Sequence, residues 1–348
     1  MDKIVHSTIY KEDLEKVFQS ISNIEILKNK SFFITGCNGL ICSVLVDFLL
    51  YLNEKYAFCC SLVLAARDIE KTKSRFSQTS SPISVIKYKA EEKLCLEKSF
   101  DYYIHGASNS SPDLYITEPV ETMMGNIEGI YQILDNVKSH KSRVLYISSS
   151  EVYGEIITDN PIKENDMGII NYENLRSSYS LSKRTSELLC RSFYEEKGVD
   201  CVIVRPGHIY GPTAKENDNR VVSQFFRDVL NNKNLILKSS GEQKRSYTYV
   251  MDCISQLVNL LINGVAGEAY NISNPKSIIS IKEMAGILAE IGNVKVLYNI
   301  RDKKNRKDNP MNNSSLSSEK VEKLLGSIGI FTKYEGFLHT YNILKSIK

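Results

Sequence analysis

The sequence lacks the features that mark nucleic-acid-binding and membrane-spanning proteins. Its Lys and Arg residues are interleaved with acidic residues, and the formal net charge of the 348-residue chain is only +3. Such a chain offers no basic stripe to a nucleic acid. The longest apolar run, 40–52, is interrupted by Asp47 and is too short to cross a bilayer. We therefore expect neither nucleic acid nor membrane as a partner.

The sequence also lacks a targeting segment and a metal-binding pattern. Residues 1–4 are not followed by the apolar core of a signal peptide. The 8 cysteines show no paired ligand spacing. We interpret them as reduced, packed thiols, which indicates a cytoplasmic protein without a metal site. The 42% apolar and 24% charged residues are typical of a globular protein.

A short apolar strand over 31–35 is followed by a glycine-rich turn and an apolar helix. Gly36 permits a tight turn, and Gly39 lets the backbone approach a phosphate at the helix N-terminus. Strand, glycine turn and helix are the context that the dinucleotide fingerprint requires. Cys42 replaces the third glycine of that fingerprint, at a position that favours a small residue. A simple strand-to-helix turn without a ligand is the competing interpretation.

The next strand, 61–66, is followed by Arg67 and Asp68. A NAD-binding protein usually has an acidic residue here for the ribose hydroxyls. Arg67 suits the 2′-phosphate of NADP, whereas Asp68 suits a ribose. A solvent-facing Arg67 explains the sequence equally well. We expect NAD as the cofactor, and Arg67 keeps NADP open.

Two further strands end in small or hydroxyl residues. The strand 101–105 leads into the small-residue turn 106–108, on which a flat cofactor can lie. His105 is flanked by apolar residues, so we expect it to pack rather than to bind a metal or act as a base. The strand 143–147 ends in the hydroxyl-rich segment 148–154. Open α/β sheets bind ligands at the carboxyl ends of their strands, so both segments should face one crevice.

Tyr179 and Lys183 lie four residues apart in a predicted helix and therefore face the same side. A lysine charge one helical turn away favours the phenolate and should lower the tyrosine pKa. Such a tyrosine can remove a proton from a sugar hydroxyl. The pair alone is common on exposed helix surfaces, and it gains significance from the glycine turn and the hydroxyl-rich strand end.

The alternation of strands and helices predicts an α/β fold with a Rossmann-like doubly wound parallel sheet. We expect the dinucleotide-binding domain over 30–206, with parts of 235–275 interleaved. A smaller C-terminal α/β substrate lid should occupy 207–348. Residues 1–29 should form a helical N-terminal extension, because apolar residues recur there at helical spacing.

The predicted lid contains helices over 220–230 and near 319–325, the second closing the chain. Arg220 and Arg245 suit a diphosphate, because guanidinium groups match phosphate oxygens. Two ordinary surface charges would look the same in the sequence.

Together these segments resemble the extended short-chain dehydrogenase/reductase family of nucleotide-sugar epimerases and dehydratases. Residues 35–39, 148–154, 179–183 and 205–212 match its motifs in order, and the resemblance runs from about residue 30 to beyond 290. UDP-glucuronate decarboxylases are most similar, because their strand-end motif Ser-Thr-Ser-Glu-Val-Tyr-Gly differs from this chain at one position.

The resemblance implies a role for each matching residue. Tyr179, hydrogen-bonded with Ser149, would remove the C4 hydroxyl proton while hydride passes to nicotinamide, and Glu151 would exchange protons at C5. The implied catalytic residues are Ser149, Glu151, Tyr179 and Lys183. The implied cofactor contacts are Gly36, Asn38, Gly39, Leu40, Ile41, Arg67, Asp68, Ala107, Ser108, Asn126, Tyr179, Lys183 and Pro206. The implied contacts of a nucleotide-diphosphate sugar are Ser150, Arg176, His208, Arg220 and Arg245.

The chain departs from the family pattern mainly in the adenosine half of the site. Lys89 stands where an adenine-contacting Asp is expected. His208 stands where an Asn usually contacts the substrate phosphates. Ser150 replaces the acid that protonates the leaving group in 4,6-dehydratases, which disfavours dehydration.

The best expectation is an NAD(P)-dependent UDP-glucuronate decarboxylase that forms UDP-xylose. A 4-epimerase, an NADPH-dependent 4-ketosugar reductase and a 4,6-dehydratase remain alternatives. A non-catalytic cofactor-sensing regulator is the alternative from another class. The resemblance also implies a homodimer, formed through the helices near 120–137 and 178–197.

Overall fold

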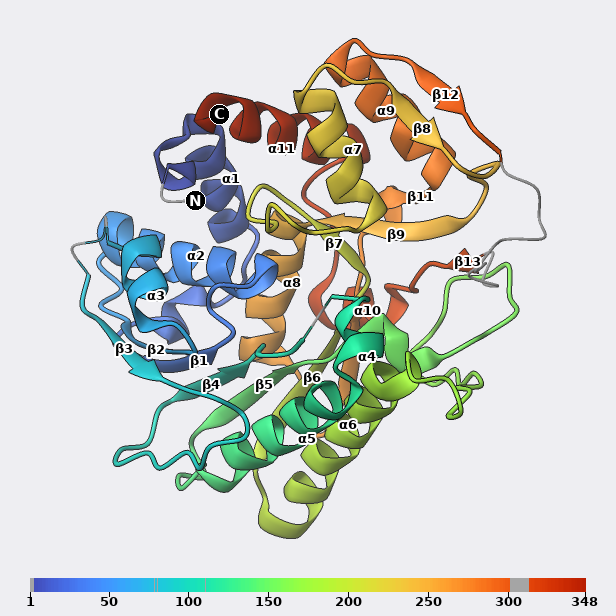
Figure 1. The fold of residues 1–348 in the computed structure, drawn as a ribbon. Helices are drawn as coiled ribbons and strands as arrows, with labels where there is room; N and C mark the ends of the chain where they lie inside the picture. The colour runs from blue at the N-terminus through green and yellow to red at the C-terminus, as the bar shows by residue number, and fades with distance from the viewer. Residues whose placement is uncertain (1–2, 78, 80, 110, 301–312) are drawn as a thin grey trace.

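The computed structural model describes residues 3–77, 79, 81–109, 111–300 and 313–348. In this part of the chain, seven parallel strands form one sheet in the order β10-β6-β5-β4-β1-β2-β3, with helices on both faces (Figure 1). The predicted Rossmann-like doubly wound sheet is confirmed. The strands are β1 (Ser31–Thr35), β2 (Ser61–Ala66), β3 (Ile83–Lys87), β4 (Tyr102–His105), β5 (Arg143–Ile147), β6 (Asp200–Pro206) and β10 (Ala269–Ile272).

The central strands are continuous apolar runs because both faces of the sheet are covered. Residues 32–35 and 144–147 are buried throughout. One apolar cluster lies under α2 (Leu40–Tyr56) and α8 (Val250–Asn263), and a second lies under α5 (Pro119–Asp135) and α6 (Ser177–Lys197). Burial of these two faces against helices supplies the main driving force for the fold.

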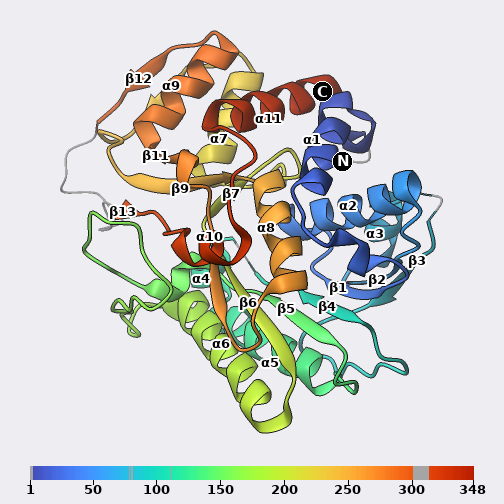
Figure 2. The same cartoon turned by 180° about the vertical axis from the view of Figure 1, so that it is seen from behind.

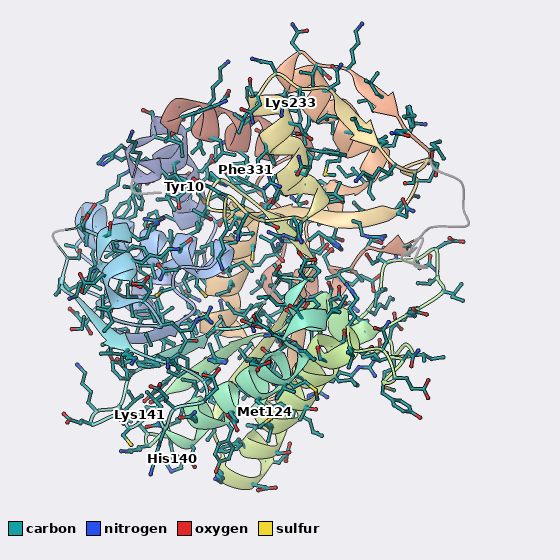
Figure 3. All side chains as sticks on the ribbon, viewed as in Figure 1. Tyr10, Met124, His140, Lys141, Lys233 and Phe331 are labelled. Atoms are coloured by element: carbon teal, nitrogen blue, oxygen red, sulfur yellow. The ribbon has the colours of Figure 1, made fainter. Side chains whose placement is uncertain are left out.

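The N-terminal residues are helical, as predicted, with α1 spanning Thr8–Gln19. Tyr10, which is labelled in Figure 3, donates a hydrogen bond of 2.7 Å to the buried carboxylate of Asp47 on α2. Tyr249 donates a hydrogen bond of 2.8 Å to Asp13 on α1. Figures 1 and 2 show α1 beside α11 (Lys333–Ile347), so both ends of the chain lie together.

The C-terminal region contains a small sheet over the carboxyl ends of the main strands. Its order is β11-β9-β13, and β7 pairs with β9. The helices α7 (Val221–Leu230) and α9 (Ile281–Gly292) pack beside the separate pair formed by β8 and β12 (Figure 1). The short strands are β7 (His208–Tyr210), β8 (Leu235–Leu237), β9 (Lys244–Tyr249), β11 (Ile278–Ser280), β12 (Val296–Tyr298) and β13 (Asn313–Ser314).

The strand β9 begins at Lys244 and forms the centre of the small sheet. One prediction about this region was wrong. The predicted helix near 319–325 exists as α10 (Glu319–Leu325), yet α11 follows it and closes the chain. Thr332 begins α11 with a capping box, in which its side chain and that of Glu335 bond each other's backbone amides.

No helix among the described residues is long and apolar enough to span a membrane. In the same residues, His, Cys, Asp and Glu side chains do not gather in groups of three that could hold a metal ion. Asp47, which interrupts the apolar run on α2, is buried and forms an ion pair with Arg75 on α3 (Ile69–Arg75).

Candidate active site

The turn after β1 has no room for a side chain at its two glycines. Gly36 adopts a φ of +72°, and a Cβ on it would lie 2.5 Å from the backbone of Gly106. A Cβ on Gly39 would lie 3.1 Å from the Gly36 carbonyl oxygen. No side chain caps the first amides of α2, whose N-cap residue is Gly39. These amides and the helix dipole suit an anion, so the turn fits the pyrophosphate of a dinucleotide. Leu40 and Ile41 provide the first amides of the helix.

Cys42 is accommodated because Gly106 faces it. The thiol is buried, and a Cβ on Gly106 would collide with its sulfur. Burial raises the pKa of Cys42 to about 12, so this thiol stays protonated and inert. The third fingerprint glycine is therefore replaced by a cysteine opposite a glycine on the neighbouring strand end.

Thr35 fixes the turn after β4. Its hydroxyl accepts hydrogen bonds of 3.2 Å from the amides of Gly106 and Ala107. Its own proton can then go to His105 Nδ1, 2.9 Å away. Burial, and then the charge of Lys183, lower the pKa of His105 to about 3. His105 is thus a neutral, packed residue, as predicted.

Asp68 caps a helix in the adenosine half of the site. One oxygen of its carboxylate accepts a hydrogen bond of 2.9 Å from the Lys71 amide at the start of α3. Asp68 is exposed, and its contact with a ribose stays a prediction. Arg67 is exposed at the end of β2. Asn38 donates a hydrogen bond of 2.7 Å to the Thr72 hydroxyl, which ties the glycine turn to α3.

A chain of hydrogen bonds connects the turn after β4 with α6. Ser108 donates to Asn126 Oδ1 at 2.7 Å, and Asn126 Nδ2 donates to Ser182 at 2.9 Å. Ser182 in turn donates to the Tyr179 carbonyl oxygen at 2.9 Å. Both Asn126 and Ser182 are buried. The network holds the backbone of the tyrosine helix against α5.

Tyr179 lies in this crevice, but its pKa shift has the opposite sign to the prediction. Burial raises the pKa of Tyr179 to about 12, and hydrogen bonds with Ser149, Tyr115 and Ser108 lower it less. Lys183 lies with Nζ 5.8 Å from the Tyr179 ring centroid, so the two side chains are neighbours as predicted. Desolvation of the phenolate therefore exceeds the local stabilisation in the free protein.

Lys183 is buried and fixed by the main chain. Its Nζ donates a hydrogen bond of 2.8 Å to the Ile147 carbonyl oxygen, at the end of β5. Burial lowers the pKa of Lys183 to about 8. The Nζ atom also lies 4.8 Å from the ring centroid of Tyr146, a cation–π contact.

The hydroxyl-rich segment after β5 forms a short 3-10 helix over Ser150–Tyr153. Ser149 caps it by accepting a hydrogen bond of 3.2 Å from the Glu151 amide, which leaves the Ser149 proton available for Tyr179. Arg176 donates to both Glu151 carboxylate oxygens at 3.2 Å. Ser150 is half-buried beside them.

The three candidate phosphate contacts lie together where β7 meets β9. His208 is opposite Tyr247 in the register of these strands, and Arg245 is two residues from Tyr247 on the same face. Burial, followed by the charges of Arg245 and Arg220, lowers the pKa of His208 to about 3. Arg220 donates to the Ile209 carbonyl oxygen at 3.0 Å and pairs with Asp218 at 2.6 Å. Two guanidinium groups thus flank a neutral imidazole.

The sequence profile described as the NAD dependent epimerase/dehydratase family matches residues 32–273. The chain belongs to this family. This epimerase/dehydratase is 31% identical over 293 residues to UDP-glucuronic acid decarboxylase 6 of Arabidopsis thaliana, with 82% of each chain covered. It is 33% identical over 213 residues to UDP-glucuronic acid decarboxylase 1 of Xenopus tropicalis, covering 60% of this chain and 50% of that relative.

Solved structures show the same fold. An epimerase from Methanothermobacter thermautotrophicus matches with a TM-score of 0.77 at 20% identity, covering 97% of this chain and 96% of that chain. The dTDP-glucose 4,6-dehydratase of Bacillus anthracis in complex with NAD matches with a TM-score of 0.74 at 18% identity, covering 91% and 97%. The predicted enzyme class, an extended short-chain dehydrogenase/reductase, is confirmed.

Two residues of the epimerase/dehydratase site were missed from the sequence. Ser182 completes the chain between Asn126 and the Tyr179 backbone. Tyr115, on α4 (Leu114–Thr117), stacks on the Tyr179 ring with 4.3 Å between centroids and 8° between planes. Ser182 follows Tyr179 by three residues, and this helical spacing could have indicated that the two lie on the same side of the helix. No pattern in the sequence around Tyr115 indicates that it lies beside Tyr179.

Proposed function

We propose that this epimerase/dehydratase oxidises C4 of a nucleotide-diphosphate sugar, and that UDP-glucuronate, decarboxylated to UDP-xylose, is its best substrate. The observation that carries the proposal is the hydroxyl of Tyr179 beside Ser149 and Lys183, at the carboxyl end of β5. The 31% identity to a UDP-glucuronic acid decarboxylase over 82% of both chains supports this substrate.

In the proposed reaction, Tyr179 as phenolate accepts the proton of the C4 hydroxyl. Ser149 has a free hydroxyl proton with which to stabilise that phenolate. A nicotinamide cofactor, when bound, supplies the hydride acceptor for C4 and later the hydride donor. Lys183, held by the Ile147 carbonyl, keeps a cation beside the phenol.

The 4-keto derivative of a uronate is a β-keto acid. When CO₂ leaves C5, the electron pair of the broken C5–C6 bond passes into the C4 carbonyl and gives an enolate. A proton must then reach C5 from water, and we assign the relay of that proton to the Glu151 carboxylate. Arg176 holds Glu151 in place through both carboxylate oxygens. Ser150 lies at the same strand end and supplies a hydroxyl for the sugar.

The diphosphate of the substrate is assigned to His208, Arg220 and Arg245, because two guanidinium groups and an imidazole converge there. In this proposal residues 30–206, with parts of 235–275, bind the cofactor, and residues 207–348 cover the substrate. Cofactor contacts are assigned to the glycine turn, Ala107, Ser108, Asn126 and Pro206, which ends β6.

A second candidate is an NADPH-dependent 4-ketosugar reductase, favoured by one pair of observations. Arg67 is exposed at the end of β2, whereas Asp68 is engaged as a helix cap. A guanidinium there suits a 2′-phosphate better than a ribose diol. Consumption of added NADPH with a 4-keto sugar, and tighter binding of NADP than NAD, would favour the reductase.

We also propose a cytoplasmic homodimer. Apolar side chains are exposed on the outer faces of α5 and α6, which lie side by side (Figure 1). An apolar surface of this kind favours association with a second copy. The exposed residues are Val120, Met124, Tyr131, Leu188 and Tyr194.

The test is incubation of the purified protein with UDP-glucuronate, with CO₂ and nucleotide sugars measured by mass spectrometry. Release of CO₂ and formation of UDP-xylose support the decarboxylase. Tyr179→Phe should abolish turnover and spare substrate binding, and the exposed Tyr172→Phe is the matched control. A product epimeric at C4 would favour the epimerase, and no turnover across a panel of nucleotide sugars would contradict catalysis.

A further inference from the structure

The nearest aromatic neighbour of Tyr179 in the described residues is a second tyrosine outside the family motif. The rings of Tyr115 and Tyr179 are nearly parallel, with 4.3 Å between centroids and 8° between planes. Both side chains are buried. A parallel ring at this distance covers one face of the phenol, excludes water from it and restricts rotation of the ring.

Tyr115 is attached to the same helix that carries Tyr179. The Ser178 hydroxyl donates a hydrogen bond of 3.0 Å to the Tyr115 carbonyl oxygen. The guanidinium of Arg176 lies 5.9 Å from the Tyr115 ring centroid while it pairs with Glu151. Tyr115 is therefore held by two residues at the start of α6, the helix that carries Tyr179.

The Tyr115 phenol stays neutral beside Tyr179. Burial raises the pKa of Tyr115 far beyond its ordinary value, so an uncharged ring covers the Tyr179 ring. The other charged or titratable groups near the pair are Tyr146, Glu151, Arg176 and Lys183.

We propose that Tyr115 is a positioning residue for proton transfer, whose ring fixes the plane of Tyr179. This inference rests on the proposed role of Tyr179 as the base. It assigns to the Tyr115 ring an effect on kcat that a phenylalanine at this position preserves and an aliphatic side chain does not.

The test compares Tyr115→Phe, which keeps the ring, with Tyr115→Leu, which removes it. For Tyr115→Phe we expect kcat to stay within about twofold of the wild type, because the stacked ring remains. For Tyr115→Leu we expect kcat to fall by about 10-fold or more with an unchanged KM, because the Tyr179 ring is then free to leave its reactive orientation. Tyr172→Phe is the control, and thermal unfolding verifies that each variant folds.

Equal losses of kcat in Tyr115→Phe and Tyr115→Leu, an unchanged kcat in Tyr115→Leu, or a change confined to KM would overturn the inference. A second measurement keeps it testable if the substrate differs from the proposed one. Fluorotyrosine introduced at position 179 reports the mobility of that ring by the fluorine NMR linewidth without turnover. Tyr115→Leu should change the linewidth and Tyr115→Phe should not, and equal linewidths in the two variants would contradict the inference. Absence of turnover in the wild type would instead contradict the proposed function.

Discussion

Arg176 holds both carboxylate oxygens of Glu151, with Nη1–Oε2 and Nη2–Oε1 distances of 3.2 Å. The pair lies beside Tyr179, whose pKa is raised first by burial and also by the charge of Glu151. Arg176 therefore neutralises a charge that works against the phenolate. Arg176, three residues before Tyr179, thus affects the pKa of Tyr179 through Glu151, which lies on the 3-10 helix Ser150–Tyr153.

Arg176→Met should make Tyr179 harder to ionise. Without the guanidinium, the Glu151 charge is uncompensated and disfavours the nearby phenolate. We expect the midpoint of the rise of kcat with pH to move upward by at least about half a pH unit. Solvent partly screens these half-exposed charges, which keeps the shift small. The measurement is a pH–rate profile, with Arg227→Met on α7 as the control. An unchanged profile would show that Glu151 does not influence the base.

Lys183 should make the stability of the free protein depend on pH. Burial lowers its pKa from 10.5 to about 8, so between these values the unfolded chain binds more protons and the free energy of unfolding rises with pH. The charged amine destabilises the fold below about pH 8, by on the order of 3 kcal/mol, and this penalty disappears above the unfolded pKa.

The measurement is urea unfolding of the wild type and Lys183→Met at several pH values. As the pH rises from about 8 to 10.5, the free energy of unfolding of the wild type should increase relative to that of Lys183→Met. Taking the difference between the two proteins removes the contribution of the other titrating groups. A difference that is constant with pH would mean that Lys183 titrates with an ordinary pKa in the folded protein.

Local sequence patterns were sufficient for the elements that bound the cofactor crevice. The strand predicted over 61–66 has those bounds in the structure, and the glycine turn lies between β1 and α2 as expected. Such elements are specified by a short apolar run and the turn residues beside it. The small sheet was not predictable in this way, because β9 pairs with β7, β11 and β13 from distant parts of the chain.

The proximity of Tyr179 and Lys183 was predictable from the sequence, whereas the energetics of the candidate site were not. Helical spacing placed Tyr179 and Lys183 together, but it carries no information about desolvation, which determines the sign of the Tyr179 pKa shift. The capping role of Asp68 was not predicted, although an Asp directly before a helix is a common cap. Tyr115 was missed because only tertiary packing of α4 on α6 brings it to Tyr179.

Arg67→Ser should discriminate between the two cofactors. If Arg67 contacts the 2′-phosphate, its removal should weaken NADP binding by about 10–100-fold, since a charged hydrogen bond contributes about 1.5–3 kcal/mol. NAD binding should be unchanged. The measurement is a pair of dissociation constants from fluorescence titration, with Lys71→Ser on the exposed face of α3 as the control. Equal losses for NAD and NADP would show that Arg67 does not select the cofactor.

Leu188→Glu should abolish the proposed homodimer. Leu188 is 64% exposed on α6, in the apolar surface that α6 shares with α5, and a carboxylate there would be desolvated without a partner on association. We expect light scattering to give the dimer mass for the wild type and the monomer mass for this variant. Val265→Glu, at a position that is 53% exposed outside α5 and α6, is the matched control and should remain dimeric. A wild-type monomer, or a Leu188→Glu dimer, would place any self-association surface elsewhere.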